Sequence, residues 1–153
     1  EGSNPISTVL FGFFLYLVPS PNFIINEHEE FFSLTKEFPI ITFYSSGYNY
    51  PDGNISLEYT HIYDDDVDNF LRLGYKHIIP IDVFEYISPG ITGFTNFNGF
   101  NGVAGEVSLG LFKFYDVFTV YSRYRYNLNP AETDQYFQEI SIGLYSHFFT
   151  IDF

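Results

Sequence analysis

Apolar and polar side chains alternate along most of the chain, which is the pattern of β-strands whose two faces meet different surroundings. In the stretch "GVAGEVSLGLF", Val103, Val107 and Leu109 share one face, and Glu106 and Ser108 share the other. Helical periodicity is weak, and turn residues recur at short intervals, as in "SGYNYPDG", "NFNGFNG" and "NLNPAETDQ". The sequence therefore predicts an all-β fold built from consecutive hairpins.

The spacing of these alternating stretches predicts eight strands. They are expected at 7–18, 37–46, 54–63, 69–79, 83–95, 102–114, 117–127 and 136–153. The segment 19–36 is predicted as a connection that can hold one short helix. The first strand rests on the run "VLFGFFLYLV", which is too short for a helix to cross a membrane but long enough for a tilted transmembrane strand. No change of composition divides the 153 residues, so we expect a single β-barrel domain over 1–153.

Two kinds of barrel fit this alternation, and they differ in which face points inward. A soluble barrel buries its apolar face, whereas a transmembrane barrel turns that face to lipid and its polar face to the lumen. The polar face here is rich in Gly, Ser and Tyr among its charges, as expected in a crowded interior. Four of the six basic residues lie on this face in mid-strand: Arg72, Lys76, Arg123 and Arg125. Four tyrosines lie near strand ends on the apolar face, where an interfacial aromatic belt would be: Tyr59, Tyr63, Tyr124 and Tyr126.

This distribution favours an eight-stranded antiparallel up-and-down transmembrane β-barrel. The first alternative is a soluble secreted or periplasmic β-barrel that binds an apolar ligand. Detergent dependence would separate the two, because a soluble barrel stays monodisperse without detergent.

The inward charges are expected to form a network that fills the lumen, because isolated buried charges are costly. Symmetric hairpins set Glu106 opposite Arg125, bring Glu139 near Arg123 and Arg125, and bring Glu58 close to Arg72 and Lys76. We expect Arg125 to bridge Glu106 and Glu139, with Tyr121 and Tyr145 above and below. The predicted network is Glu58, Arg72, Lys76, Glu106, Arg123, Arg125 and Glu139. Such a lumen is closed, so the barrel is not expected to be a channel.

Composition narrows the class of protein further. The 19 acidic and 6 basic residues give a formal charge of −13, which excludes a nucleic acid as partner. The chain has no cysteine, which excludes a disulfide framework and thiolate chemistry. It has no methionine either, so Glu1 is not the encoded start, and a cleaved signal peptide is the expected reason.

The C-terminal stretch "YSHFFTIDF" carries large apolar residues at alternate positions, interrupted by His147: Tyr145, Phe149, Ile151 and Phe153. It resembles the C-terminal signature of bacterial outer-membrane β-barrels. The whole chain resembles small eight-stranded outer-membrane barrels of Gram-negative bacteria, and its acidic, Tyr- and Phe-rich style is similar to that of Bacteroidota. The resemblance implies that these four residues are an assembly signal for the barrel-assembly machinery. It also implies location in the outer membrane, in contact with lipid and lipopolysaccharide.

One departure from the family pattern concerns the phase of this last strand. Ile140, Ile142 and Leu144 occupy the opposite phase to Phe149, Ile151 and Phe153, and a β-bulge near Ser146 would reconcile them. Pro89 is also unusual in a central strand, where a bulge or an early strand end is expected.

The resemblance places both termini on the periplasmic side and the connections 19–36, 64–68, 96–101 and 128–135 outside. The longest of them is acidic but interleaved with apolar residues: Phe23, Ile24, Ile25, Phe31, Phe32 and Leu34. Exposed apolar groups of this kind often mark a contact surface, so we interpret them as a partner-contact loop. The other interpretation is that the segment folds over the barrel mouth and packs on itself. Docking would make the protein a structural or accessory subunit of a larger outer-membrane complex.

Candidate chemistry is sparse. Some barrels of this family modify lipid A with a His-x-Ser pair, but none of His28, His61, His77 and His147 has a serine two residues later. Ser146 and His147 are adjacent and point to opposite faces of a regular strand. The sequence therefore predicts a non-enzymatic protein with no cofactor, and a lipid A-modifying enzyme is the second alternative.

Two acidic clusters are candidates for binding a hard cation such as Ca²⁺. One is "DDDVD", with Asp64, Asp65, Asp66 and Asp68, and the other is "NEHEE", with Glu27, His28, Glu29 and Glu30. The first lacks the glycine and the bidentate glutamate of a dedicated calcium loop. Solvated acidic loops are the preferred interpretation, so no metal site is predicted.

Overall fold

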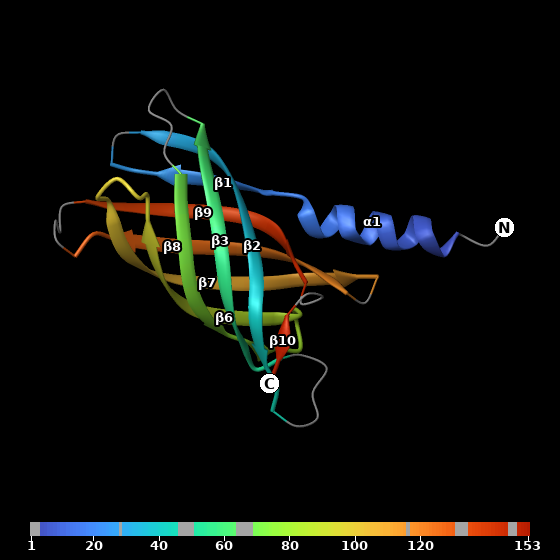
Figure 1. Ribbon diagram of the computed structural model, residues 1–153. Coiled ribbons are helices and arrows are strands. Elements are labelled where there is room, and N and C mark those ends of the chain that lie inside the picture. The colour runs from blue at the N-terminus through green and yellow to red at the C-terminus, as the bar shows by residue number, and fades with distance from the viewer. Residues whose placement is uncertain are drawn as a thin grey trace.

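The structure, a computed structural model, describes residues 4–27, 29–45, 51–63, 69–115, 117–130, 135–146 and 150–153. It is a closed antiparallel barrel (Figure 1). Its eight strands are β1 (Ser20–Ile25), β2 (Glu30–Phe43), β3 (Gly53–Tyr63), β4 (Asn69–His77), β6 (Tyr86–Thr95), β7 (Asn101–Phe114), β8 (Phe118–Leu128) and β9 (Tyr136–Tyr145). Each pairs with the next along the chain, and β1 pairs with both β2 and β9, which closes the ring. The predicted all-β, eight-stranded barrel is confirmed.

The first predicted strand is wrong, because residues 7–17 belong to the helix α1 (Pro5–Leu17). The Asn4 side chain accepts a hydrogen bond from the Ile6 N–H at 3.2 Å, and Pro5 occupies the first turn, where its missing N–H costs nothing. Val18 precedes a proline and is extended, which ends the helix. Figure 1 shows α1 projecting away from the barrel. A short, continuously apolar run does not distinguish strand from helix by its period.

The eighth barrel strand comes instead from the segment 19–36, which is not a connection. Its residues form β1 and the first part of β2, and the Asn26 N–H donates to the Glu29 carbonyl at 2.9 Å in the turn between them. In β1, Ser20, Asn22 and Ile24 are buried, while Phe23 faces outward. The expected number of strands is therefore right, although the first strand is a different segment.

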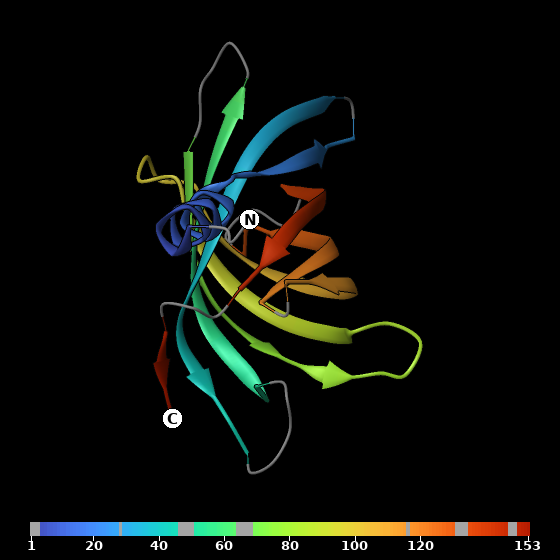
Figure 2. The ribbon, with the colours of Figure 1, turned by 90° about the vertical axis from the view of Figure 1, so that its right-hand side faces the viewer.

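The two ends of the barrel differ in what they carry. The hairpin end holds the connections β1–β2, β3–β4, β6–β7 and β8–β9. The last three were predicted to lie together, and the first is a short turn within the segment 19–36 that was predicted as one long connection. The terminal end holds the connections β2–β3, β4–β6 and β7–β8, together with α1 and the two-residue strand β10 (Ile151–Asp152). Figure 2 shows α1 nearly end-on at this end, so the helix runs roughly along the barrel axis.

The predicted last strand, 136–153, is also wrong in its second half. β9 ends at Tyr145, and β10 pairs in parallel with β2 through Ile151 and Ile41. The Phe153 N–H then donates to the Thr42 carbonyl at 2.9 Å. β2 and β9 both run antiparallel to β1 and thus in one direction. β10 pairs with β2 at Ile41 and Thr42, beyond Thr35, where the pairing of β2 with β1 stops. The change of phase comes from the end of β9, and no bulge within a continuous strand is needed.

The regular strand pairing of the wall is interrupted at three positions. Pairing shifts register between Pro39 and Ile41 in β2 and between Gly110 and Phe112 in β7, as at β-bulges. Pro89 lies in β6 beside an interruption: β4 pairs with β6 as far as Gly90, and the short strand β5 (Ile79–Pro80) resumes the pairing at Ile87. β6 itself continues through Pro89, which pairs in register with Val107 of β7, so the bulge or strand end expected at this residue is not found. Pro89 lies instead in the gap between β4 and β5 on the other side of β6, where no ladder hydrogen bond is required of it.

The barrel is polar inside and apolar outside. Arg72 is 1% exposed, whereas its neighbour Leu73 is 56% exposed, and the same contrast separates Arg125 from Tyr124 in β8. Exposed outward side chains include Ile91, Val107, Ile140, Ile142, Tyr59, Tyr63 and Tyr126. The predicted assignment of faces is therefore confirmed. Among the described residues, no helix is long and apolar enough to span a bilayer.

Candidate functional site

Four cationic and four carboxylate side chains meet in the middle of the lumen. They are Glu37 of β2, Glu58 of β3, Arg72 and Lys76 of β4, Glu106 of β7, Arg123 and Arg125 of β8, and Glu139 of β9. Six of the eight strands thus contribute, each through residues on its inward phase. All eight side chains are at most 8% exposed. We call this group the lumen network.

Arg125 lies at the centre of the lumen network. Strand pairing sets it beside Glu106 on β7 and Glu139 on β9, as predicted. Its Nη2 is 2.5 Å from a carboxylate oxygen of Glu106 and 2.5 Å from one of Glu58, and its Nη1 is 3.5 Å from Glu139. The planar guanidinium offers five donors, so one side chain can hold several carboxylates. The predicted bridge is confirmed, and Glu58 adds a third carboxylate.

Glu58 itself is arranged differently from the prediction. It lies opposite Arg72 in the pairing of β3 with β4, but its carboxylate reaches across the lumen to Arg123, at 2.7 Å, and to Arg125. Arg72 pairs instead with Glu139 at 2.9 Å. The prediction considered only neighbouring strands. In a narrow barrel, long side chains from opposite walls also meet, and these contacts replace the expected ones.

Lys76 and Arg123 are joined by a residue that sequence reasoning missed. Glu37 accepts hydrogen bonds from both, at 3.0 Å from Arg123, and Lys76 also lies 3.1 Å from Glu106. The predicted second strand began at Glu37, so this residue was placed at a strand end rather than in mid-strand. Its phase was the available signal, because Glu37 alternates with Thr35 and Ser33, which are both buried.

Amides and hydroxyls complete the lumen network. Asn22 donates to Glu139 at 2.9 Å, Asn127 donates to the other oxygen of Glu139 at 2.8 Å, and Thr35 donates to Glu58. Each carboxylate lone pair that finds a donor reduces the cost of removing these charges from water. Asn22 was missed because its segment was interpreted as a connection.

The lumen network is formally neutral, which leaves the charge of the protein on its outside. Removing four carboxylates from the 19 acidic residues and four cations from the 6 basic ones leaves 15 against 2. The surface beyond the lumen is therefore strongly acidic.

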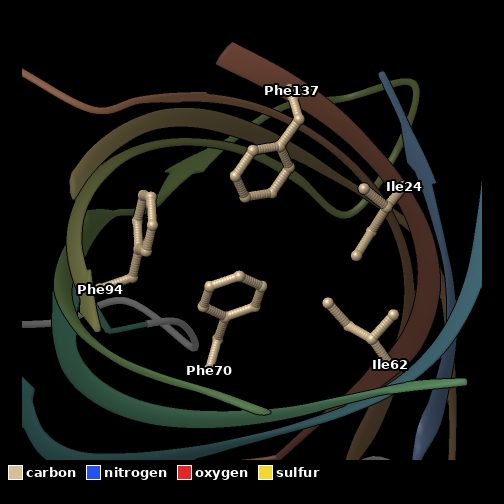
Figure 3. Packing of buried hydrophobic residues seen from close by; sticks show 5 residues of the cluster. All are labelled: Ile24, Ile62, Phe70, Phe94 and Phe137. Atoms are coloured by element: carbon tan, nitrogen blue, oxygen red, sulfur yellow. The ribbon is translucent and has the colours of Figure 1, made fainter. Parts of the chain in front are cut away.

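Aromatic and aliphatic side chains close the lumen on both sides of the network. At the hairpin end, Ile24, Ile62, Phe70, Phe94 and Phe137 point inward and pack together (Figure 3). The guanidinium of Arg72 lies 4.6 Å from the ring centre of Phe94, which joins this cluster to the network.

At the terminal end, the closing cluster is Ile78, Tyr86, Tyr121 and Tyr145. Tyr121 and Tyr145 therefore share one side of the network, where one was expected on each side. A Cβ atom on Gly143 would lie 2.7 Å from the Tyr121 hydroxyl, so glycine makes room for that ring. A cavity of about 10 Å³ remains beside this cluster, enough for about one water molecule.

The purified protein should show no steady single-channel conductance in planar bilayers. The lumen network and the two closing clusters pack the part of the lumen that the structure describes, so we expect no continuous aqueous path for ions. Current recording at several voltages measures this directly. A reproducible open level that persists after detergent controls would contradict the packed interior.

The residues assigned to a partner-contact loop are part of the barrel wall. Ile24 is buried in the lumen and Phe31 packs against the same cluster, while Phe23 and Phe32 are exposed on the outer face. Ile25 and Leu34 are half-buried in β1 and β2. The prediction of a loop is wrong because alternate residues of this segment face opposite sides of a strand.

The residues assigned to the assembly signal are dispersed. Tyr145 is buried in the lumen, Ile151 and Phe153 are exposed at the terminal end, and Phe149 lies outside the described residues. Their role in assembly stays a prediction.

The other candidate residues that the structure describes give no catalytic or metal geometry. Asp64, Asp65, Asp66, Asp68, His28 and His147 lie outside the described residues. His61 faces outward, with its Nδ1 2.6 Å from Asn69 Oδ1, to which the Tyr59 hydroxyl also donates at 2.7 Å. Within the described ranges, no three His, Cys, Asp or Glu residues are grouped so that they could hold a metal ion.

Comparison with protein-family models, with curated proteins and with solved structures finds no match. The functional argument therefore rests on the geometry of this chain.

Proposed function

We propose that the chain is a transmembrane β-barrel of the bacterial outer membrane, with a non-enzymatic role as a structural or accessory subunit of a larger outer-membrane complex. The observation that carries the proposal is the inverted barrel: charges fill the interior, and apolar side chains cover the wall. A wall of this kind is stable only where hydrocarbon, and not water, surrounds it. Lipid, lipopolysaccharide and the barrel-assembly machinery are the partners that this location implies.

The dimensions of the wall support this location. Seven of the eight barrel strands have 9 to 14 residues, and about 9–11 tilted residues cross a bilayer. Phe23, Phe32 and Tyr63 lie side by side near the hairpin end, with ring centres 5.6 and 6.1 Å apart. The outward polar groups of His61 and Asn69 lie near the same end. Aromatic rings followed by polar groups are typical of the edge of a membrane-spanning band.

The soluble barrel with an apolar ligand has weaker support. Such a protein needs an apolar cavity, usually of some hundreds of Å³. Here the middle of the lumen is charged, and the described cavity has about 10 Å³. A lipid A-modifying enzyme also lacks support, because His61 and His77, the histidines within the described ranges, are not followed two residues later by serine.

A single tryptophan introduced into the wall tests the membrane location. The chain has no tryptophan and no cysteine, so one reporter gives an unmixed signal. Ile91→Trp should be quenched strongly by lipids brominated on their acyl chains, because Ile91 faces outward in mid-strand. Val83→Trp is the control, since Val83 is also exposed but lies in the β4–β6 connection. Equal, weak quenching at both positions, with a protein that stays monodisperse without detergent, would favour the soluble barrel.

Replacing Phe153 with serine should reduce the yield of folded, heat-modifiable barrel in cells several-fold. The expectation follows from the resemblance of the C-terminus to an assembly signal, and serine leaves the backbone bonds of Phe153 to β2 in place. Phe97→Ser is the matched control, because Phe97 is 73% exposed and Phe153 is 71% exposed. Normal assembly of Phe153→Ser, or an equal loss in both variants, would contradict a role of Phe153 in an assembly signal.

A further inference from the structure

The helix α1 exposes more apolar surface than a free element can keep in water. Its 13 residues include no charged side chain. Seven large apolar residues are between 46% and 71% exposed: Ile6, Val9, Leu10, Phe11, Phe13, Phe14 and Leu17. Together they present roughly 800 Å² of apolar surface, about what one partner buries in a standard protein interface.

The apolar residues are spread widely around α1. At 100° per residue, their positions cover an arc of about 200°, about twice the stripe that a surface helix turns to its own core. Helices that lie on a membrane surface carry a strongly charged face, which α1 lacks. A flat surface would leave part of this arc in water, so the geometry calls for a groove.

The contacts of α1 with the barrel set its direction. Tyr16, its buried residue, packs against Phe38 with ring centres 5.8 Å apart, and the Lys36 amine lies 5.4 Å from the Tyr16 ring. Phe11 meets Tyr115 of the β7–β8 connection edge to face at 6.4 Å. Beyond these contacts the helix projects from the terminal end along the barrel axis, as both ribbon views show. It does not lie along the apolar wall.

This direction decides between lipid and protein as the occupant. With the barrel across a membrane, a helix of about 20 Å that extends along the axis leaves the hydrocarbon layer. The terminal end around it is acidic on balance: its described connections and β10 carry Asp52, Asp82, Glu85 and Asp152, against Lys113 near the end of β7 and Lys36 beside Tyr16. A second copy of the chain would bring the same charges and is disfavoured.

We propose that α1 is the element by which this barrel docks on a protein partner, whose apolar groove encloses the helix and whose rim is basic. The inference rests on the proposed function, because the transmembrane barrel is what places α1 outside the hydrocarbon layer. It identifies α1 as the surface by which an accessory subunit would contact the larger complex. The contact lies at the terminal end and not at the segment 19–36.

The test compares two variants of α1 with one control. Val9→Gln and Phe14→Gln change positions about 140° apart on the helix, so a groove should sense both. Val83→Gln changes an apolar residue that is 83% exposed at the same end. The protein is taken from its native membrane into native nanodiscs, and the mass of the particle is measured.

The wild type and Val83→Gln should run as one discrete assembly larger than the barrel alone. Each α1 variant should lower the assembled fraction about tenfold or more, as for a buried anchor residue, with heat modifiability unchanged. Asp82→Lys combined with Glu85→Lys should also weaken the assembly several-fold. Unchanged assembly in the glutamine variants, or a wild type that is monomeric, overturns the proposal.

The other occupants give different results. Quenching of Phe14→Trp by brominated lipid would make the bilayer the occupant, and a dimer of the purified protein that Phe14→Gln disrupts would make it a second copy. An intact mass that lacks residues 5–17 would remove the helix from the mature protein. Each of these results overturns the proposal. Ile91→Trp tests the wall independently of α1. If brominated lipid does not quench it, the proposed membrane location is wrong, whatever the α1 variants show.

Discussion

Replacing Arg125 with alanine should lower the free energy of unfolding by about 3–5 kcal/mol, the range for breaking a buried ion pair. Glu58, Glu106 and Glu139 would all lose a cation in a site from which water is excluded. Urea unfolding in detergent or lipid vesicles, followed by circular dichroism and by heat modifiability on gels, measures the difference. This variant should be the most damaging change in the lumen network, since no other cation there contacts three carboxylates.

Arg125→Met separates charge from packing, because methionine keeps much of the side-chain volume. It should be nearly as unstable as Arg125→Ala if the unpaired carboxylates are the cause. Combining Arg125→Met with Glu58→Gln should recover part of the loss, since one uncompensated charge disappears with its partner. A loss below about 1 kcal/mol for Arg125→Ala would mean that water or the other cations compensate, contrary to the closed lumen.

Replacing Ile91 with arginine should cost about 2–4 kcal/mol in a bilayer, as measured for charges at mid-depth on the lipid face of barrels. Ile91 is 64% exposed in mid-strand, so the same change on a water-facing wall would alter stability by less than about 0.5 kcal/mol. Reversible unfolding from lipid vesicles gives the value. The size of this loss therefore distinguishes a wall that faces lipid from a wall that faces water.

Val83→Arg is the control for Ile91→Arg, because Val83 is more exposed but lies in a connection at the terminal end. It should leave stability unchanged. Equal and small effects at both positions would place the wall in water and contradict the transmembrane barrel. Equal and large effects would point to a general intolerance of arginine, and the comparison would then favour neither location.

The assignment of inward and outward faces was predictable because it depends on local information. A strand alternates with a period of two residues, and a short connection fixes the register of the two strands it joins. The connection between β7 and β8 is short, so Glu106 could be set opposite Arg125 from the sequence. The predicted ion pairs were therefore close to the observed ones where both residues lie on strands that follow each other in the sequence.

Contacts that depend on closure of the ring were not predictable. Glu58 contacts Arg123 across the lumen, from a strand that is not adjacent in the sheet. The local sequence pattern gives no information about the distance between such strands. The strand that closes the ring was predicted at 7–18, whereas it is β1 at Ser20–Ile25. The six-residue strand β1 lies in "PSPNFII", where two prolines argue against predicting a strand. The apolar run before it fits a strand and a helix equally well. Asn4, Pro5 and Pro19 were the residues that could have located the helix boundaries.

The junction of β1 with β9 has a consequence for how the chain folds. Seven of the ring's eight strand pairs join neighbours in the sequence and can form as soon as each hairpin is complete. The eighth brings Asn22 to Ser141, and β10 reaches β2 across a similar separation in sequence. Long-range pairings of this kind carry most of the loop-closure entropy and are the slow ones. The barrel can therefore grow hairpin by hairpin as an open, curved sheet, and it becomes a ring only when both ends of the chain are present.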